Sequence, residues 1–132
     1  MNLKKIGLFA LAMIMTLFSF QTYSFAAEEM EWVKKAPMPT ARYSYDKVIV
    51  YEDKIYIYGG TTGSDALANL EMYDPEKDKW NKLPNSSIGR YFTTFVENQG
   101  KFYAIGGYVD NTASETNIVE EYDPLSNSWS RK

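Results

Sequence analysis

Two tandem copies of one ordered pattern constrain this chain more than any other feature of its sequence. The first copy runs Lys54-Ile-Tyr-Ile-Tyr-Gly-Gly60, then Glu71-Met-Tyr-Asp-Pro75 and Trp80, and the second runs Lys101-Phe-Tyr-Ala-Ile-Gly-Gly107, then Glu120-Glu-Tyr-Asp-Pro124 and Trp129. Equivalent positions lie 47 to 49 residues apart. Self-similarity at such a period is typical of repeat architectures, in which each copy forms one structural unit.

The first 26 residues have the layout of a secretory signal peptide. Lys4 and Lys5 precede an uncharged apolar run over residues 6–20, and the small residues Ser24 and Ala26 favour cleavage before Ala27. The run has 15 residues, whereas a helix that spans a bilayer needs about 20. We therefore expect a cleaved signal over residues 1–26 rather than a membrane anchor, and a protein that is secreted or otherwise extracytoplasmic, in the periplasm, at the cell surface or in the medium.

The composition excludes several classes of function. Without residues 1–26 the chain keeps 12 basic and 17 acidic residues, a net charge of −5. Such an acidic chain is poorly suited to nucleic acid or to anionic membranes. There is no Cys and no His in the sequence, so there is no disulfide framework, and the commonest general base and metal ligand are missing. We predict no catalytic residue, no metal and no cofactor.

Short segments rich in Tyr, Ile, Val and Phe alternate with clusters of Gly, Pro, Asn and Asp, which indicates strands and turns. Within each repeat we expect four strands, named A to D. They span residues 43–51, 54–58, 69–73 and 79–83 in the first repeat and residues 91–97, 101–105, 118–122 and 128–130 in the second. A spare piece at residues 31–35 resembles strand D of the first repeat, so we expect an orphan strand there.

Strand B is apolar at successive positions in both repeats, where a strand with one wet face would alternate. A run that is apolar on both faces predicts a sheet covered on both sides. Antiparallel four-stranded sheets stacked face to face are the blades of a β-propeller. A two-layer sandwich ranks second because it would show clean alternation.

The double glycine after a hydrophobic run, the spaced Tyr and Trp, and the Pro and Arg between Trp and the next strand resemble kelch repeats. The resemblance covers residues 32–132 and implies an all-β fold with two complete antiparallel four-stranded blades of an incomplete propeller. The expected organisation is a signal peptide at 1–26, an orphan strand and lead-in at 27–40, kelch repeat 1 at 41–84 and kelch repeat 2 at 85–132.

Most conspicuous residues of the repeat are expected to be structural. The glycines lack the surrounding motif of a phosphate-binding loop, Asp74 and Asp123 sit in identical turns, and Glu71 and Glu120 need a donor such as Arg if they are buried. The aromatic residues could form a sugar-stacking platform, but their fixed place in each repeat favours an inter-blade core. The residues assigned to the structural motif are Gly59, Gly60, Tyr73, Trp80, Gly106, Gly107, Tyr122 and Trp129.

Arg42 and Arg90 recur 10 residues after Trp32 and Trp80, each followed by Tyr. In kelch propellers this position begins strand A near the central channel, on the face that carries the D-to-A and B-to-C loops. Two roles stay open, and they are not exclusive: a salt bridge to Glu71 or Glu120, and contact with a ligand carboxylate. With the polar B-to-C loops, the candidate ligand-binding residues are Arg42, Tyr43, Thr61, Thr62, Ser64, Arg90, Tyr91, Tyr108, Asp110 and Asn111.

The resemblance implies an exported module that binds a protein or carbohydrate partner through this loop face. The alternative is a kelch-type sugar epimerase or mutarotase acting on an acidic sugar such as sialic acid, with channel-facing Arg and Glu as binding and proton-transfer groups. A copper-radical oxidase, which shares a kelch-like propeller, needs His and Cys, and this chain has neither.

Two blades cannot close a ring, because propellers typically have about four to eight. Two open blade faces lined with Ile, Tyr and Phe would exceed the apolar surface that soluble monomers usually expose. We therefore expect further blades or self-association to complete the propeller.

Overall fold

The computed structural model describes residues 31–43, 48–109 and 114–132. The chain divides into two units, residues 1–33 and 34–132, and every strand found belongs to the second. The first sheet contains β1 (Val48–Tyr51), β2 (Lys54–Tyr58), β3 (Leu70–Asp74) and β4 (Lys79–Leu83), and the second contains β5 (Thr94–Asn98), β6 (Lys101–Ile105), β7 (Val119–Asp123) and β8 (Ser128–Arg131). No helix within these residues is long and apolar enough to cross a bilayer.

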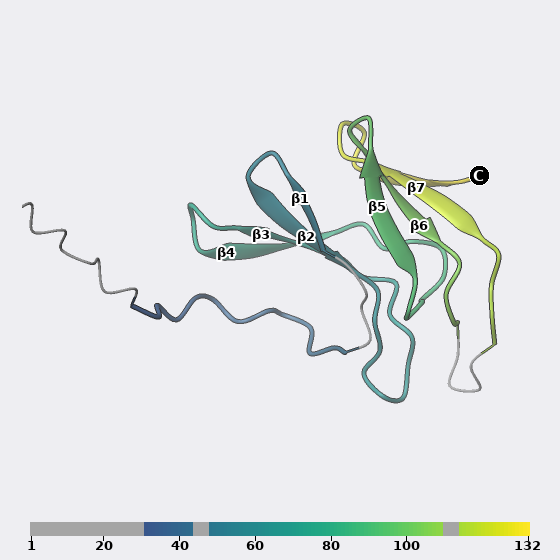
Figure 1. Ribbon diagram of the computed structural model, residues 1–132, viewed down its shortest axis with the longest axis horizontal. Helices are drawn as coiled ribbons and strands as arrows, with labels where there is room; N and C mark the ends of the chain where they lie inside the picture. The colour runs from purple at the N-terminus through teal and green to yellow at the C-terminus, as the bar shows by residue number, and fades with distance from the viewer. Residues whose placement is uncertain (1–30, 44–47, 110–113) are drawn as a thin grey trace, which may run out of the picture. The chain divides into compact units, whose positions relative to one another are not determined.

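Each sheet is an antiparallel meander in which neighbouring strands in sequence are neighbours in space, in the orders β1-β2-β3-β4 and β5-β6-β7-β8. The two sheets lie side by side with β1 next to β5 (Figure 1). We call them blade 1 and blade 2. The all-β prediction of two four-stranded antiparallel blades is confirmed.

The expected A strands begin earlier than β1 and β5, and residues 44–47 of the first one lie outside the described residues. Tyr43 and Tyr91 lie outside β1 and β5 and form isolated bridges instead, Tyr43 with Thr61 and Tyr91 with Tyr108. Their backbones therefore bond to the loops that follow β2 and β6 rather than extending the ladder with β2 or β6. These bridges fasten the start of each blade to its own B-to-C loop.

Residues 31–38 contain no strand, and the Trp32 side chain is fully exposed. A D strand needs a C strand beside it, and both described C strands, β3 and β7, already pair with β4 and β8. The orphan strand expected at residues 31–35 therefore has no partner among the described strands. The boundaries expected for the signal peptide (1–26), the lead-in (27–40) and the two kelch repeats (41–84 and 85–132) stay a prediction.

The hydrophobic core lies between the blades rather than inside either sheet. Phe102 of blade 2 is fully buried and makes edge contacts with Tyr51 and Tyr56 of blade 1, at ring-centroid distances of 5.5 and 4.8 Å. Tyr58 of blade 1 packs against Phe95 and Trp129 of blade 2 at 5.2 and 5.1 Å. Such aromatic pairs add about 0.5–1.5 kcal/mol each beyond the area they bury.

The cross-strand register determines which residues share a face. In blade 1 one face carries Val48, Val50, Ile55, Ile57, Tyr73 and Trp80, because these are direct cross-strand partners. We call this the front face of blade 1. Its back face carries Ile49, Tyr56, Tyr58, Leu70 and Met72 and packs against blade 2.

The C-to-D turns of the two blades share one tyrosine hydrogen bond. Tyr73 donates its hydroxyl to Asp78 Oδ1 and Tyr122 donates to Asn127 Oδ1, both at 2.6 Å. Asp78 and Asn127 both have a left-handed backbone, with φ of 47° and 51°. The hydrogen bond to the Asp78 carboxylate raises the pKa of Tyr73 to about 12. These bonds fix each tyrosine ring for packing beside its tryptophan.

The back face of blade 2 carries a charged cluster centred on Glu121, whose side chain is 9% exposed. Glu121 accepts hydrogen bonds from Tyr103 Oη at 2.8 Å and Lys101 Nζ at 3.0 Å, and Lys132 Nζ lies 3.1 Å away. These donors, Tyr103 first, lower the pKa of Glu121 from 4.5 to about 2. The carboxylate is therefore ionised throughout the neutral range.

This cluster predicts a loss of stability in acid. A depressed folded-state pKa contributes stability above the unfolded-state pKa of 4.5, and that contribution is lost as the pH falls toward about 2. Urea unfolding of the wild type between these two pH values should show a steeper decline than unfolding of Glu121→Gln. The same substitution at the exposed Glu115 serves as the control and should keep the wild-type slope. Equal slopes for the wild type and Glu121→Gln would contradict the assignment.

Candidate functional site

The two predicted arginines are buried inside the blades and are paired with glutamates. Arg42 Nη2 donates to Glu71 Oε2 at 2.6 Å, and Arg90 Nη2 donates to Glu120 Oε2. Both arginine side chains are 0% exposed. The salt-bridge alternative of the sequence analysis is confirmed, and in this structure neither guanidinium reaches a surface that a ligand could contact.

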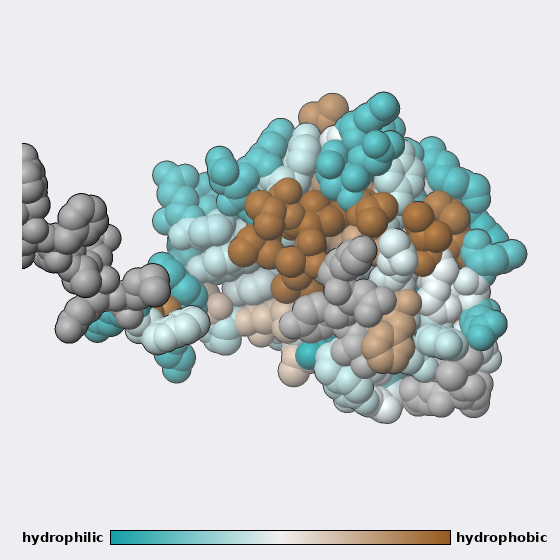
Figure 2. Space-filling view, in the orientation of Figure 1, coloured by the Kyte–Doolittle hydropathy of each residue, from teal (hydrophilic) through white to brown (hydrophobic). Residues whose placement is uncertain are grey.

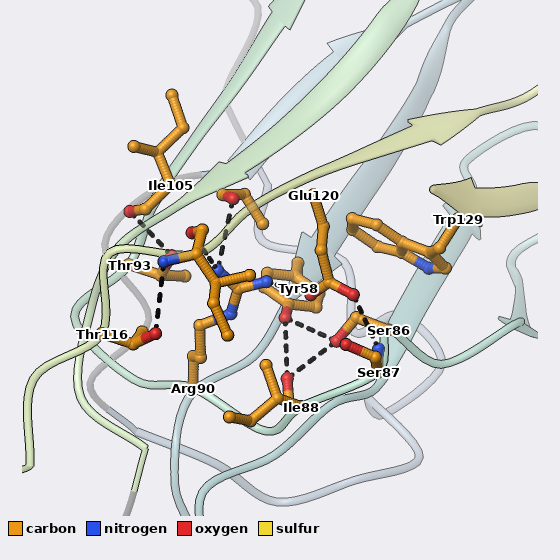
Figure 3. Close-up of polar contacts among 12 residues, drawn as sticks. Tyr58, Ser86, Ser87, Ile88, Arg90, Thr93, Ile105, Thr116, Glu120 and Trp129 are labelled. Carbon is orange, nitrogen blue, oxygen red and sulfur yellow. Dashed lines mark hydrogen bonds and ion pairs between the residues drawn. The ribbon is translucent and has the colours of Figure 1, made fainter. Parts of the chain in front are cut away.

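Each arginine also bonds to backbone carbonyls at the ends of strands in its own blade. Arg42 Nη1 donates to the carbonyl of Gly59 at 2.8 Å, and Arg90 Nη1 donates to the carbonyl of Ile118 at 2.9 Å. Figure 3 shows the Arg90 side chain next to Tyr58 of blade 1 and Glu120 of blade 2, with its guanidinium carbon 5.9 Å from the Tyr58 ring centre. The Arg90 pair therefore lies at the junction of the two blades.

The linker into blade 2 is held against the loop of blade 1 by its backbone. Gly60 N donates to Arg90 O at 2.8 Å, and Arg90 N donates to Leu67 O at 2.9 Å. A Cβ on Gly59 would lie 2.5 Å from Arg90 O, so only glycine permits this approach. This geometry agrees with the structural role predicted for the double glycine. The same backbone contacts bring the first B-to-C loop close to Tyr91.

Because the Arg90–Glu120 pair is buried, we expect that breaking it lowers the stability of the fold strongly. Arg90→Met would leave the Glu120 carboxylate buried without its cation, which costs about 3–5 kcal/mol of unfolding free energy. Replacing both residues, as Arg90→Met with Glu120→Leu, should recover much of that loss. The exposed Arg131, changed to Met, is the matched control and should shift stability by about 0.5 kcal/mol or less. Denaturant unfolding measures all three, and a loss below about 1 kcal/mol in Arg90→Met would contradict a buried pair.

The remaining predicted residues divide into structural and exposed ones. Thr61 is 6% exposed, and its hydroxyl donates to Asp65 O and accepts from Gly63 N, so it shapes the loop. Thr62 and Ser64 are exposed with their hydroxyl oxygens 3.1 Å apart. Tyr43 is 57% exposed. Asp110 and Asn111 lie outside the described residues.

Tyr91 and Tyr108, two of the candidate ligand-binding residues, lie together with ring centres 5.5 Å apart. The sequence analysis missed Phe92, which contacts both, at 5.6 Å from Tyr91 and 6.5 Å from Tyr108. Phe92 is 51% exposed and has a left-handed backbone with φ of 49°. A bulky residue in that conformation is a genuine outlier, and such outliers gather at functional sites.

The contacts on either side of Phe92 explain its backbone. Tyr91 is held in its bridge by reciprocal backbone bonds with Tyr108, at 3.0 and 2.9 Å. Thr93 is 1% exposed, and its hydroxyl donates to Gly106 O at 3.0 Å. The chain must turn between these two fixed points, so the left-handed conformation falls on Phe92. We define the loop face as Tyr43, residues 61–65, Tyr91, Phe92 and Tyr108.

Among the described residues no group of three or more acidic side chains is arranged to hold a metal ion. The family model for the kelch motif matches residues 47–87 and 89–132, which together exceed half of the chain. The chain belongs to the kelch-repeat family. Each matched segment contains one of the two blades, so every blade is one kelch repeat.

Proteins with curated descriptions are similar over half or more of this chain. Alpha-scruin from Limulus polyphemus is 32% identical over 117 residues, which cover 84% of this chain and 13% of that protein. Kelch-like protein 21 from Rattus norvegicus is 38% identical over 66 residues, 50% of this chain and 11% of that protein. The chain thus spans only a small part of these kelch relatives.

Two solved structures are similar in fold. YjhT superimposes with a TM-score of 0.70 at 16% identity, over 81% of this chain and 42% of that one. A fungal alcohol oxidase of the AA5 family, described in complex with copper, gives a TM-score of 0.53 at 25% identity, over 60% of this chain and 19% of that one. The comparison with YjhT supports an incomplete kelch propeller.

Proposed function

We propose that this chain is part of an exported kelch propeller that binds a protein partner through its loop face. The observation that carries the proposal is Phe92, a half-exposed aromatic residue in a left-handed conformation, in ring contact with Tyr91 and Tyr108. Such a conformation costs of order 1–3 kcal/mol. Exposure of the phenyl ring to water costs further free energy. A binding partner that covered the ring would remove that second cost.

The residues around Phe92 are of the types that bind protein surfaces. Rigid aromatic residues are enriched in the centres of protein interfaces, and small hydroxyl residues supply adaptable hydrogen bonds around them. The loop face has the same arrangement, with Phe92, Tyr91 and Tyr108 beside the exposed Thr62 and Ser64. The hydroxyl residues adjoin the aromatic residues because the backbones that precede them are bonded. Gly60 precedes the Thr61 loop, and its N–H donates to the carbonyl of Arg90, which precedes Tyr91.

Phe92→Asn separates a binding role from a structural one. Asn tolerates the left-handed conformation better than Phe, so the unfolding free energy should stay unchanged or rise by about 1 kcal/mol. Peptides selected from a displayed library on the wild type should bind this variant at least about tenfold more weakly, because an aromatic anchor is lost. The exposed Leu125→Asn is the matched control and should keep wild-type affinity.

Peptides that bind wild type and Phe92→Asn equally would overturn the proposed site. A parallel glycan array tests the other ligand class: retention of a glycan, lost in Phe92→Asn, with no selected peptide would replace the protein partner by a carbohydrate. Failure to retain either class on the wild type would overturn the proposed binding function.

Export is proposed from residues 1–26 alone, whose charged start, apolar run and small residues at Ser24 and Ala26 suit a cleaved signal. Mass spectrometry of the full chain expressed in a bacterium should find the mature protein outside the cytoplasm, beginning at Ala27. Cytoplasmic retention of the intact chain would contradict this prediction.

A further inference from the structure

The isolated bridges of blade 2 place three side chains in one row on the loop face. Tyr91 bridges Tyr108 on one side, and Glu115 bridges Tyr108 on the other. Residues directly opposite each other in an antiparallel pair project to the same face, and the two tyrosine rings do so with their centres 5.5 Å apart. Glu115 therefore projects from the same face, on the side of Tyr108 away from Tyr91. We call Tyr91, Tyr108 and Glu115 the bridge row of blade 2.

Blade 1 has the same bridges with different side chains. Its row is Tyr43, Thr61 and Ala66, so a threonine that is 6% exposed stands in place of Tyr108, and a methyl group stands in place of Glu115. The bridges therefore form without a second aromatic ring and without a carboxylate. The repeated scaffold does not account for Tyr108 and Glu115.

The exposed charges of the loops and linkers around this row have one sign. The two B-to-C loops contain acidic residues and no Lys or Arg, and the two linkers that adjoin them contain one basic residue each, Arg42 and Arg90. Both arginine side chains are 0% exposed and are paired with glutamates, whereas Asp65 and Glu115 are exposed. These four segments are residues 36–43, 61–68, 84–93 and 108–117. They therefore present carboxylates to a partner without an exposed cation among their described residues.

The Glu115 carboxylate is accessible to a partner. No ion pair to it is found in the part of the chain that the structure describes. Glu115 lines a cavity of about 440 Å³ together with Thr116 and Arg131, among others. Arg131 lies on the same cavity without forming an ion pair to Glu115. The cavity leaves room for a long side chain that crosses Tyr108 to end at this carboxylate.

The aromatic rings of the loop face suit a cation better than an aliphatic group. The Phe92 ring is inclined by 57° to the ring of Tyr91 and by 81° to that of Tyr108, so the rings do not form one flat platform. The faces of Phe and Tyr rings attract a Lys or Arg cation within about 6 Å of the ring centre. Figure 2 shows the strongest hydrophobic patch over the strands, whereas the loops at the lower end of the view are mostly in pale or hydrophilic colours. A partner therefore meets aromatic rings and carboxylates at the loop face.

Given the function proposed above, on which this step depends, we infer that the protein partner presents a Lys or Arg side chain to the bridge row. The side chain lies over the rings of Phe92 and Tyr108, and its cation ends at the Glu115 carboxylate. Both contacts strengthen when the partner excludes water from them. The balance of the whole chain, with 14 basic and 17 acidic residues, favours the same partner because an acidic protein attracts basic surfaces.

The test uses peptides selected from a displayed library on the full wild-type chain. The selected peptides are expected to share a Lys or Arg. Replacing that residue by Gln in a synthetic peptide should weaken binding at least about fivefold, because the replacement removes both the contact with the rings and the ion pair. Fluorescence anisotropy of the labelled peptide at low salt measures the affinities.

Glu115→Gln isolates the ion pair. This variant should bind the basic peptide about threefold more weakly and the Gln peptide as the wild type does, because the two substitutions remove the same contact. Glu115 is exposed, so the fold should be preserved, and urea unfolding checks this. Glu76→Gln removes an exposed acid at the β3–β4 turn. It is the matched control and should bind both peptides as the wild type does.

The outcomes distinguish the cationic contact from the binding site itself. Selected peptides that lose affinity for Phe92→Asn but share no basic residue would overturn the cationic contact and keep the loop face as the site. Basic peptides that bind Glu115→Gln as tightly as the wild type would have the same consequence. Peptides that bind Phe92→Asn and the wild type equally, or a library from which the wild type retains nothing, would overturn both proposals.

Discussion

A four-stranded blade that is apolar on both faces needs a neighbour on each side, and the rest of this structure depends on that requirement. The buried cluster takes residues from both sheets, with Ile49, Tyr56, Tyr58 and Leu70 from blade 1 and Phe95, Phe102, Ala104 and Tyr122 from blade 2. Neither sheet has a comparable core of its own. The two blades therefore stabilise each other through one shared aromatic interface, whereas the two outer faces have no covering blade among the residues that the structure describes.

Face-on-face packing also forces polar groups into the interior. The linker from blade 1 to blade 2 runs beside the ends of β2 and β6, where backbone carbonyls such as that of Ile118 would be buried without donors. Arg90 supplies those donors, and its charge is compensated by Glu120. Arg42 and Glu71 repeat the arrangement in blade 1. The most conspicuous charged residues of the repeat are therefore part of the scaffold, although their composition alone would also suit a ligand carboxylate.

Strands B, C and D agree closely with the segments expected from the sequence, because turn residues and apolar runs are local signals. Strand A was expected to begin too early, since Tyr43 and Tyr91 have the composition of strand residues but bond to Thr61 and Tyr108 in loops. Those bridges depend on contacts between segments distant in sequence. For the same reason Phe92 was missed: its left-handed backbone results from what holds Tyr91 and Thr93, and no local pattern encodes it.

Comparing the two repeats position by position locates what is specific to this chain. Positions that agree between the repeats have matching scaffold contacts. Tyr73 packs beside Trp80 as Tyr122 does beside Trp129, and Glu71 and Glu120 each pair with an arginine. Some positions that differ are found on exposed surfaces. Phe92 follows Arg90-Tyr91 where the first repeat has Ser44, and Glu121 and Lys132 replace Met72 and Leu83. A repeat fold repeats its packing from blade to blade, so exposed positions where the repetition is broken are the ones that the scaffold does not explain.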